Sequence, residues 1–165
     1  MEHRERRERV LVALRQDARL TAAQLAERLA LPEDEVRTII RTAESDHTIR
    51  GYSVLLNDNA FAHPPVRALI EVSVQPERDA GFDRLARQLS RFPEVTDVQL
   101  VSGNYDLLLT VWGETLQDVA NFVASKLSPL AGVRSTRTHF LLRRYKEAGF
   151  QMEEDEHYER LRVTP

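Results

Sequence analysis

Residues 94–113 read EVTDVQLVSGNYDLLLTVWG and decide the fold, because they hold two β-patterned runs joined by a short connection. The runs are residues 95–101 and 105–112, and the tripeptide Ser-Gly-Asn at 102–104 joins them. Glycine and asparagine tolerate the positive φ that a tight connection needs, so this stretch predicts a β-hairpin.

Asp106 is the unusual residue of this hairpin, because the pattern places it just inside the second strand, where aspartate is normally depleted. A carboxylate beside a glycine loop is suited to bind the ammonium group of a small cationic or zwitterionic ligand. The alternative is a structural role, in which Asp106 caps the hairpin or pairs with Arg134 or Arg137.

The residues around the hairpin predict a four-stranded antiparallel sheet and two helices. Apolar and polar residues alternate over 66–74, and apolar residues recur at helical spacing over 82–92 and again over 116–127. A last strand is predicted over 133–145, with Thr136 and Thr138 on one side. The resulting order, β-α-β-β-α-β, is the ferredoxin-like split βαβ arrangement.

Two helices cover only one face of such a sheet. The other face carries apolar residues, with Leu69, Val101 and Leu108 among the candidates. An exposed apolar face of this kind predicts that a second subunit covers it.

The first 52 residues predict three helices followed by a strand, which is the winged helix-turn-helix pattern. Thr21 is a suitable N-cap for the second helix, and Pro32 suits the first position of the third. A strand is expected over residues 49–56, broken early by Gly51. In this pattern the third helix lies across the second, and its outer face can enter a DNA major groove.

The predicted fold class is therefore α+β, with a winged helix-turn-helix followed by a ferredoxin-like βαββαβ domain for ligand sensing and assembly. We expect the DNA-binding domain over residues 1–52, a linker rich in turn residues over 53–65, and the effector-binding and oligomerisation domain over 66–146. Residues 147–165 are expected to form an acidic C-terminal tail.

The composition, with 42% hydrophobic and 30% charged residues, is that of an ordinary globular protein. No apolar run approaches the roughly 18 residues of a membrane-spanning helix. The charged N-terminus lacks the apolar core of a signal peptide, so we expect a cytoplasmic protein with no membrane partner. The chain has no cysteine, and its five histidines lack partners at metal-ligand spacing, so we expect no metal site, no cofactor and no catalytic residues.

The net charge of −3 is no argument against DNA binding, because the acidic excess lies in the C-terminal tail. Residues 1–52 hold ten arginines and ten acidic residues, and residues 151–165 alone carry a net charge of −3.

With these elements in this order, the chain resembles the Lrp/AsnC family, the feast/famine transcription regulators. The resemblance covers residues 5 to about 145 and is carried by the segments DARLTAAQLAERLAL, IRGYSVLLN, RFPEVTDVQLVSGNYDLLLTVWG and GVRSTRTHFLLRRYK. It implies DNA recognition by the third helix and a homodimer formed through the C-terminal sheets, often assembling further into tetramers or octamers. It also implies a small effector, usually an amino acid, bound near the glycine hairpin at a contact between dimers.

The resemblance also implies which residues bind the effector. The effector-loop motif matches Gly103, Asn104, Tyr105 and Asp106, and the polar start of the last strand matches Ser135, Thr136 and Thr138. An amino acid needs an acceptor for its ammonium group, which Asp106 offers, and donors for its carboxylate, which backbone N–H groups or threonine hydroxyls offer.

The third helix departs from the family pattern, because it opens with Pro32, Glu33, Asp34 and Glu35 where a groove-reading helix meets phosphates. The candidates for DNA contact are Thr21, Arg37, Thr38, Arg41 and Arg50. Arg37 or Arg41 is suited to read guanine, and the others only to position the DNA backbone. The alternative for both arginines is ion pairing at i,i+4 spacing with residues such as Glu33 or Glu44.

The sequence thus predicts a sequence-specific DNA-binding transcriptional regulator whose C-terminal domain oligomerises and senses an amino acid or related metabolite. Its DNA partner would be a double-stranded, pseudo-palindromic promoter site. The alternative is an oligomeric metabolite-binding protein with weak or vestigial DNA binding, for which the acidic third helix is the evidence. A small enzyme has only the lone Asp106 in its favour, so we expect none.

Overall fold

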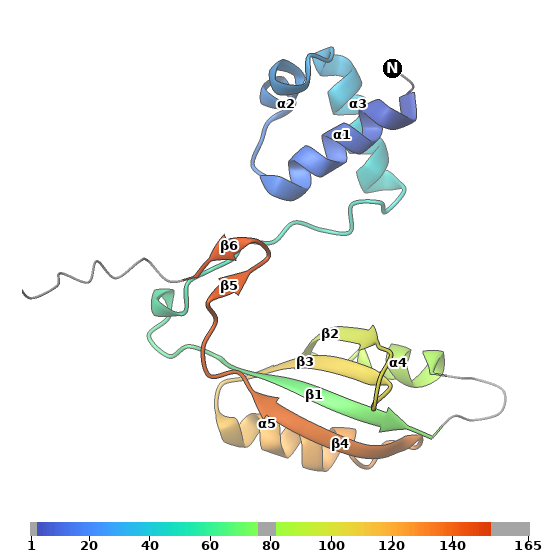
Figure 1. Ribbon diagram of the computed structural model, residues 1–165, viewed down its shortest axis with the longest axis vertical. Helices are drawn as coiled ribbons and strands as arrows, with labels where there is room; N and C mark the ends of the chain where they lie inside the picture. Colours follow the sequence, from blue (N-terminus) through green and yellow to red (C-terminus); the bar gives the residue numbers. More distant parts are fainter. Residues whose placement is uncertain (1–2, 76–81, 153–165) are drawn as a thin grey trace, which may run out of the picture. The chain divides into compact units, whose positions relative to one another are not determined.

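A computed structural model describes residues 3–75 and 82–152, and the chain divides into two compact units, Met1–Val54 and Leu55–Pro165 (Figure 1). The part of the expected acidic tail that begins at Glu153 lies outside the described residues. No helix in the described part of the chain is both long and apolar enough to span a bilayer.

The first unit consists of the three predicted helices, α1 (His3–Gln16), α2 (Ala22–Leu29) and α3 (Glu33–Ser45). Thr21 caps α2 in a capping box with Gln24, and Ala30 ends the helix in the left-handed conformation with φ of 53°. Each helix contributes to one small core, made by Val10, Ala13, Leu14, Leu25, Ala26, Leu31, Val36 and Ile39.

Two details of this unit differ from the sequence prediction. Pro32 is the N-cap of α3 rather than its first residue, because its ψ of 137° is extended. The strand expected over residues 49–56 is absent, since residues 50–57 pair with no other strand in the described ranges. A strand needs a neighbouring backbone to satisfy its N–H and C=O groups, and the described chain supplies none here.

The second unit contains a four-stranded antiparallel sheet in the order β2-β3-β1-β4, which confirms the ferredoxin-like arrangement and with it the α+β class (Figure 1). The strands are β1 (Val66–Val74), β2 (Val95–Leu100), β3 (Leu107–Gly113) and β4 (Val133–Phe140). The helices are α4 (Asp83–Leu89) and α5 (Leu116–Phe122), and α5 continues as the π-helical turn η2 (Val123–Leu127).

The helices lie on one face of the sheet, and the core lies between them and the strands (Figure 1). Alternate residues of β1 are buried and pair with buried residues of β3, as Ile70 does with Leu109 and Val72 with Leu107. Phe122 of α5 packs edge-on against Phe92, with their ring centroids 5.6 Å apart.

The last strand of the sheet is shorter than predicted, because β4 ends at Phe140 rather than near residue 145. Phe140 pairs with Ala68, close to the start of β1, so little of a neighbouring strand remains beyond it. The chain instead forms a small hairpin of β5 (Lys146–Glu147) and β6 (Phe150–Gln151), which occupies residues expected to begin the tail.

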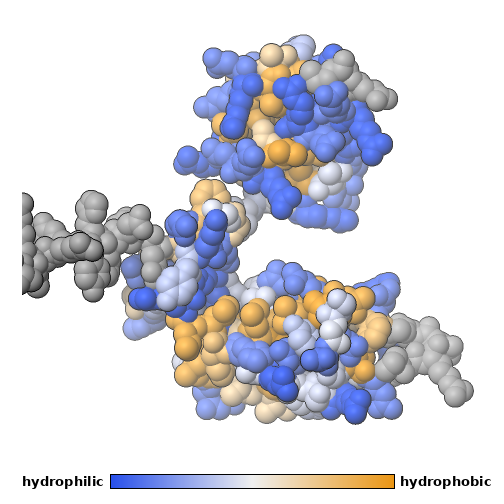
Figure 2. All heavy atoms as spheres, viewed as in Figure 1, coloured by the Kyte–Doolittle hydropathy of each residue, from blue (hydrophilic) through white to orange (hydrophobic). Residues whose placement is uncertain are grey.

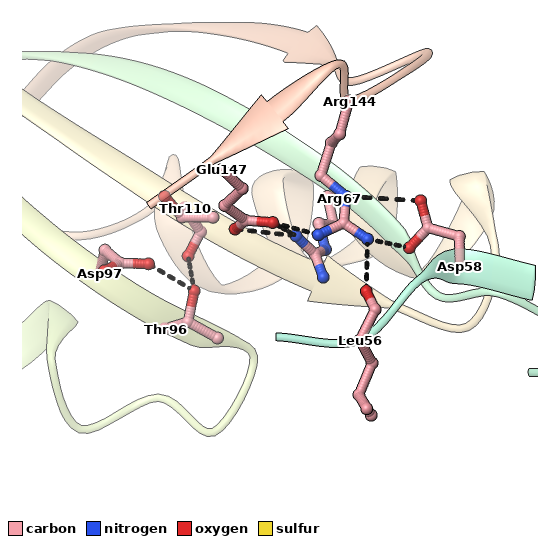
Figure 3. A network of polar contacts seen from close by, with 8 residues as sticks. All are labelled: Leu56, Asp58, Arg67, Thr96, Asp97, Thr110, Arg144 and Glu147. Atoms are coloured by element: carbon pink, nitrogen blue, oxygen red, sulfur yellow. Dashed lines mark hydrogen bonds and ion pairs between the residues drawn. The ribbon is translucent and has the colours of Figure 1, made fainter. Parts of the chain in front are cut away.

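A cluster of polar residues, which we call the Arg144 cluster, joins this hairpin to the linker and to the sheet (Figure 3). Arg144 pairs with Asp58 and with Glu147, and it donates to the carbonyl oxygen of Leu56 at 3.1 Å. Glu147 also accepts from Arg67 of β1 at 3.2 Å, and the Arg67 guanidinium lies 3.9 Å from the ring centroid of Trp112. The cluster therefore fixes the end of the linker against the sheet.

We expect the Arg144→Gln substitution to loosen this attachment. It removes two ion pairs at a side chain that is only 10% exposed, so the unfolding free energy of the second unit should fall by about 1–3 kcal/mol. Amide hydrogen exchange of Ala60 and Phe61, whose N–H groups donate to Asn57 and Asp58, should become faster. The control is Arg134→Gln, at an exposed arginine of β4 that makes no ion pair within the described residues. Equal exchange in the two variants would contradict the role of the cluster.

Candidate functional site

The third helix buries one face in the core of the first unit and exposes the other. Val36, Ile39 and Ala43 are buried. At 3.6 residues per turn, the opposite face carries Asp34, Thr38 and Arg41, and all three are exposed. This outward face is the surface that α3 can present to a DNA groove.

The acidic start of α3 is largely neutralised by arginines of the same unit. Glu35 accepts two hydrogen bonds from Arg6 of α1, at 2.9 and 3.1 Å, and Glu33 pairs with Arg37 one turn later. Asp34 makes no ion pair in the described part of the chain. The sequence suggested three carboxylates facing phosphates, but two of them are already paired with cations.

A second contact anchors the other end of α3 to α1. Arg7 donates to Asp46 at 2.6 Å and to the hydroxyl of Thr48 at 2.8 Å. The hydrogen bonds from Thr48, and then the Arg7 guanidinium, hold the pKa of Asp46 below its ordinary value. Arg6 and Arg7 were not among the predicted functional residues, because their partners lie 29 and 39 residues away in sequence.

Some of the predicted DNA-contacting residues already form hydrogen bonds or ion pairs within the chain, and others do not. Arg37 forms the i,i+4 pair with Glu33 that was its alternative role, and the Thr38 hydroxyl donates to the Asp34 carbonyl at 2.8 Å. Thr21 is occupied as the cap of α2. Arg41 and Arg50 are exposed and make no ion pair among the described residues.

The loop of the β2–β3 hairpin is longer than predicted, since β3 begins only at Leu107. Tyr105 and Asp106 therefore belong to the loop and not to the strand. Gly103 has a φ of 144°, which favours glycine, whereas Asn104 does not adopt the positive φ expected of it. A Cβ atom built on Gly103 would meet no atom within 4 Å, so the loop is open at this point.

Asp106 ties this loop to the sheet. One carboxylate oxygen, Oδ2, accepts the N–H of Val74 at 2.7 Å, and the Asp106 N–H donates to the carbonyl of Val72 at 3.0 Å. The alternative pairing with Arg137 is not formed, because Arg137 contacts Glu71 at 3.3 Å. The other carboxylate oxygen, Oδ1, makes no hydrogen bond within the described residues, so it is available to a ligand.

The polar residues at the start of β4 lie on two different faces of the sheet. Thr136 pairs with Val72 and Thr138 with Ile70, which places both threonines on the helix-covered side. Ser135 pairs with Ser73 and lies on the open side. Since β1 separates β3 from β4, one protomer does not bring all of these residues together with the hairpin.

The open face of the sheet holds a charged cluster between apolar residues. Glu71 contacts Arg137 at 3.3 Å and His139 at 3.0 Å, while Leu69, Val101 and Leu108 are half-buried. Figure 2 shows this face, with hydrophilic residues bordered by apolar ones. Glu71 was not among the predicted functional residues, although the alternation of β1 places it on the same face as Leu69.

Comparisons with known proteins agree with both units. A model described as "Lrp/AsnC ligand binding domain" matches residues 67–149, and one described as "Winged helix-turn-helix DNA-binding" matches residues 4–50. The chain is 38% identical to an uncharacterized HTH-type transcriptional regulator, YugG, of Bacillus subtilis, over 98% of both chains. It is 31% identical to the leucine-responsive regulatory protein of Rhizobium meliloti, over 85% of this chain and 89% of that protein.

Solved structures show the same architecture. A transcriptional regulator of Neisseria meningitidis in complex with L-Met matches with a TM-score of 0.69 and 26% identity, over 86% of this chain and 91% of that one. AsnC of E. coli matches in fold, with a TM-score of 0.65 and 17% identity over 87% and 94% of the two chains.

The bond from Val74 to Asp106 predicts different effects for two substitutions. Asp106→Ala leaves the Val74 N–H without its acceptor and should lower the unfolding free energy by about 1–3 kcal/mol. Asp106→Asn keeps an oxygen acceptor and should stay much closer to the original stability. Urea unfolding at a fixed protein concentration measures both.

The control is Asp83→Ala, which removes an exposed carboxylate paired with Arg87 at 3.6 Å and should change stability by less than about 0.5 kcal/mol. An Asp106→Ala variant as stable as the unsubstituted chain would show that the carboxylate has no structural role.

Proposed function

The chain belongs to the Lrp/AsnC family of transcriptional regulators, and we propose that α3 reads a pseudo-palindromic promoter site while the second unit assembles the protomers and binds an amino acid. Members of this family bind DNA, bind small effectors and form oligomers, and its relatives are regulators rather than enzymes.

The observation that carries the DNA-binding part is the charge of the outward face of α3. With Glu33 and Glu35 paired to arginines, this face offers Arg41 without a competing ion pair in the described chain. Arg41 is suited to donate two hydrogen bonds to guanine in the major groove. The acidic third helix therefore no longer supports a vestigial role in DNA binding.

The remaining candidates contribute to positioning. Arg37 can exchange its pair with Glu33 for a phosphate, because both side chains are about half exposed and such pairs are weak. Arg50, and Thr21 at the start of α2, are assigned to contacts with the DNA backbone. Thr38, on the same face of α3 as Arg41, is assigned to the same positioning role.

The assembly part of the proposal rests on the open face of the sheet. Its half-buried apolar residues and its Glu71 cluster are suited to a homodimer, which further contacts would extend to a tetramer or octamer. A dimer presents two copies of α3, so its half-sites should lie about one helical turn, or a multiple of it, apart.

The effector part rests on the hairpin loop. Asp106 can bind an ammonium group through Oδ1 while Oδ2 keeps its bond to Val74, and the backbone at Gly103 and Asn104 is open to a carboxylate. Tyr105 lies beside them in the same loop. Since β1 separates the loop from Ser135, Thr136 and Thr138, we assign those three residues to the site as contributions of a neighbouring subunit.

A mobility-shift experiment tests the DNA-reading helix. The chain should retain its own promoter DNA, more strongly at low salt, and Arg41→Ala should weaken binding about tenfold or more. The double variant Arg37→Ala/Arg41→Ala should abolish the shift. The control is Arg87→Ala in the second unit, which removes an exposed cation far along the chain from α3. A normal shift with the double variant would mean that α3 is not the reader.

Calorimetry with the twenty amino acids tests the effector site. At least one amino acid should bind, and Asp106→Asn should weaken its binding about tenfold or more, because the ammonium loses a charged partner. This variant keeps the acceptor for Val74, so the loss would reflect the charge and not the fold. If no amino acid binds to the unsubstituted chain, the sensor function is wrong.

A further inference from the structure

Asp34 is placed differently from the two carboxylates beside it. Glu33 and Glu35 are held by Arg37 and Arg6, whereas Asp34 lies on the outward face of α3 without an ion pair among the described residues. It is exposed, and it borders an open cleft of about 320 Å³ that His3 and Arg7 of α1 also line.

Asp34 occupies a position from which a recognition helix contacts the edges of DNA bases. It lies in the first turn of α3, and in helix-turn-helix proteins the N-terminal residues of the recognition helix contact base edges. The Thr38 hydroxyl donates to the Asp34 backbone carbonyl and not to its carboxylate, so the carboxylate keeps its full capacity to accept. Arg6 and Arg37 are bound to the neighbouring glutamates, and Arg7, which lines the same cleft as Asp34, is bound to Asp46.

A carboxylate in the major groove discriminates strongly among the four bases. Guanine and the O4 of thymine present acceptors, which repel it, and adenine places an acceptor beside its donor. Cytosine presents the N4 amino donor and no acceptor in the major groove. It is therefore the one base that can donate to Asp34 without also repelling its carboxylate. Elsewhere on DNA the same charge opposes binding, because it adds repulsion from the phosphates.

We propose that Asp34 is a specificity-determining residue, which accepts a hydrogen bond from the N4 amino group of one cytosine in each half-site. This inference rests on the proposed function of α3 as the reading helix. Arg41 follows Asp34 by seven residues, or about 10 Å along the helix axis. The cytosine and the guanine read by Arg41 should therefore lie about three base pairs apart.

Selection of bound DNA from a random pool tests the assignment with three forms of the full-length chain. The unsubstituted chain should enrich sites with one cytosine at a constant place in each half-site. Asp34→Asn should enrich adenine at that place, because asparagine pairs with the N6 and N7 of adenine. Asp34→Ala should enrich no base there, while the other positions of the site stay unchanged.

A direct binding measurement gives the magnitude. Replacing the cytosine by thymine should weaken binding of the unsubstituted chain about tenfold or more, and that of Asp34→Ala less than about twofold. Asp34→Ala should also bind unrelated DNA more tightly, because it removes a charge that repels phosphates.

The matched control is Glu33→Gln, which removes a neighbouring carboxylate and releases Arg37, and which should keep the cytosine preference. If Asp34→Asn enriches the same sites as the unsubstituted chain, the inference is overturned and α3 can still be the reader. If the unsubstituted chain enriches no sequence at all, the proposed function itself is wrong, and the inference falls with it.

Discussion

The arginine–carboxylate contacts between α1 and α3 determine what the first unit can do. Arg6 holds Glu35 at the start of α3, and Arg7 holds Asp46 just beyond its end. The pairs are partly exposed, so each stabilises the fold only modestly. Their larger effect is on charge, because they place a cation beside a carboxylate that would otherwise oppose DNA phosphates. The outward face of α3 thereby keeps Arg41 and Asp34 as its two unpaired charges in the described chain.

In the second unit, one oxygen of the Asp106 carboxylate holds the loop to the sheet, and the other can accept a hydrogen bond from a ligand. The loop bends away from β1 before the antiparallel ladder is complete, and Oδ2 supplies the acceptor that the Val74 N–H lacks. Because the side chain is fixed by this bond, Oδ1 is held at a defined place in the same loop as Gly103. A binding group that is positioned before its ligand arrives loses little conformational entropy when it binds.

The parts of the fold that depend on periodic burial could be predicted from the sequence. The alternation over residues 66–74 and the helical spacing of the flanking segments led to the βαββαβ order, which the sheet confirms. The parts that depend on distant partners could not be predicted. Residues 49–56 have a strand-like sequence but no pairing strand, and β4 stops where β1 begins. The residues proposed for the sites were found from motif and composition, while the partners of Asp106, Glu35 and Arg144 required three-dimensional contacts.

The Arg144 cluster holds one end of the chain segment that joins the two units. Ile49 is hydrogen-bonded to Ala43 at the end of α3, and the carbonyl of Leu56 is bound by Arg144. Six residues, Arg50 to Leu55, lie between these two points, and among them the Tyr52 hydroxyl donates to Glu44 of α3 at 2.9 Å. The chain from Ile49 to Leu56 spans at most about 25 Å when fully extended. When two DNA-binding units are joined through short tethers in one assembly, the binding of the first half-site raises the effective concentration at which the second is met.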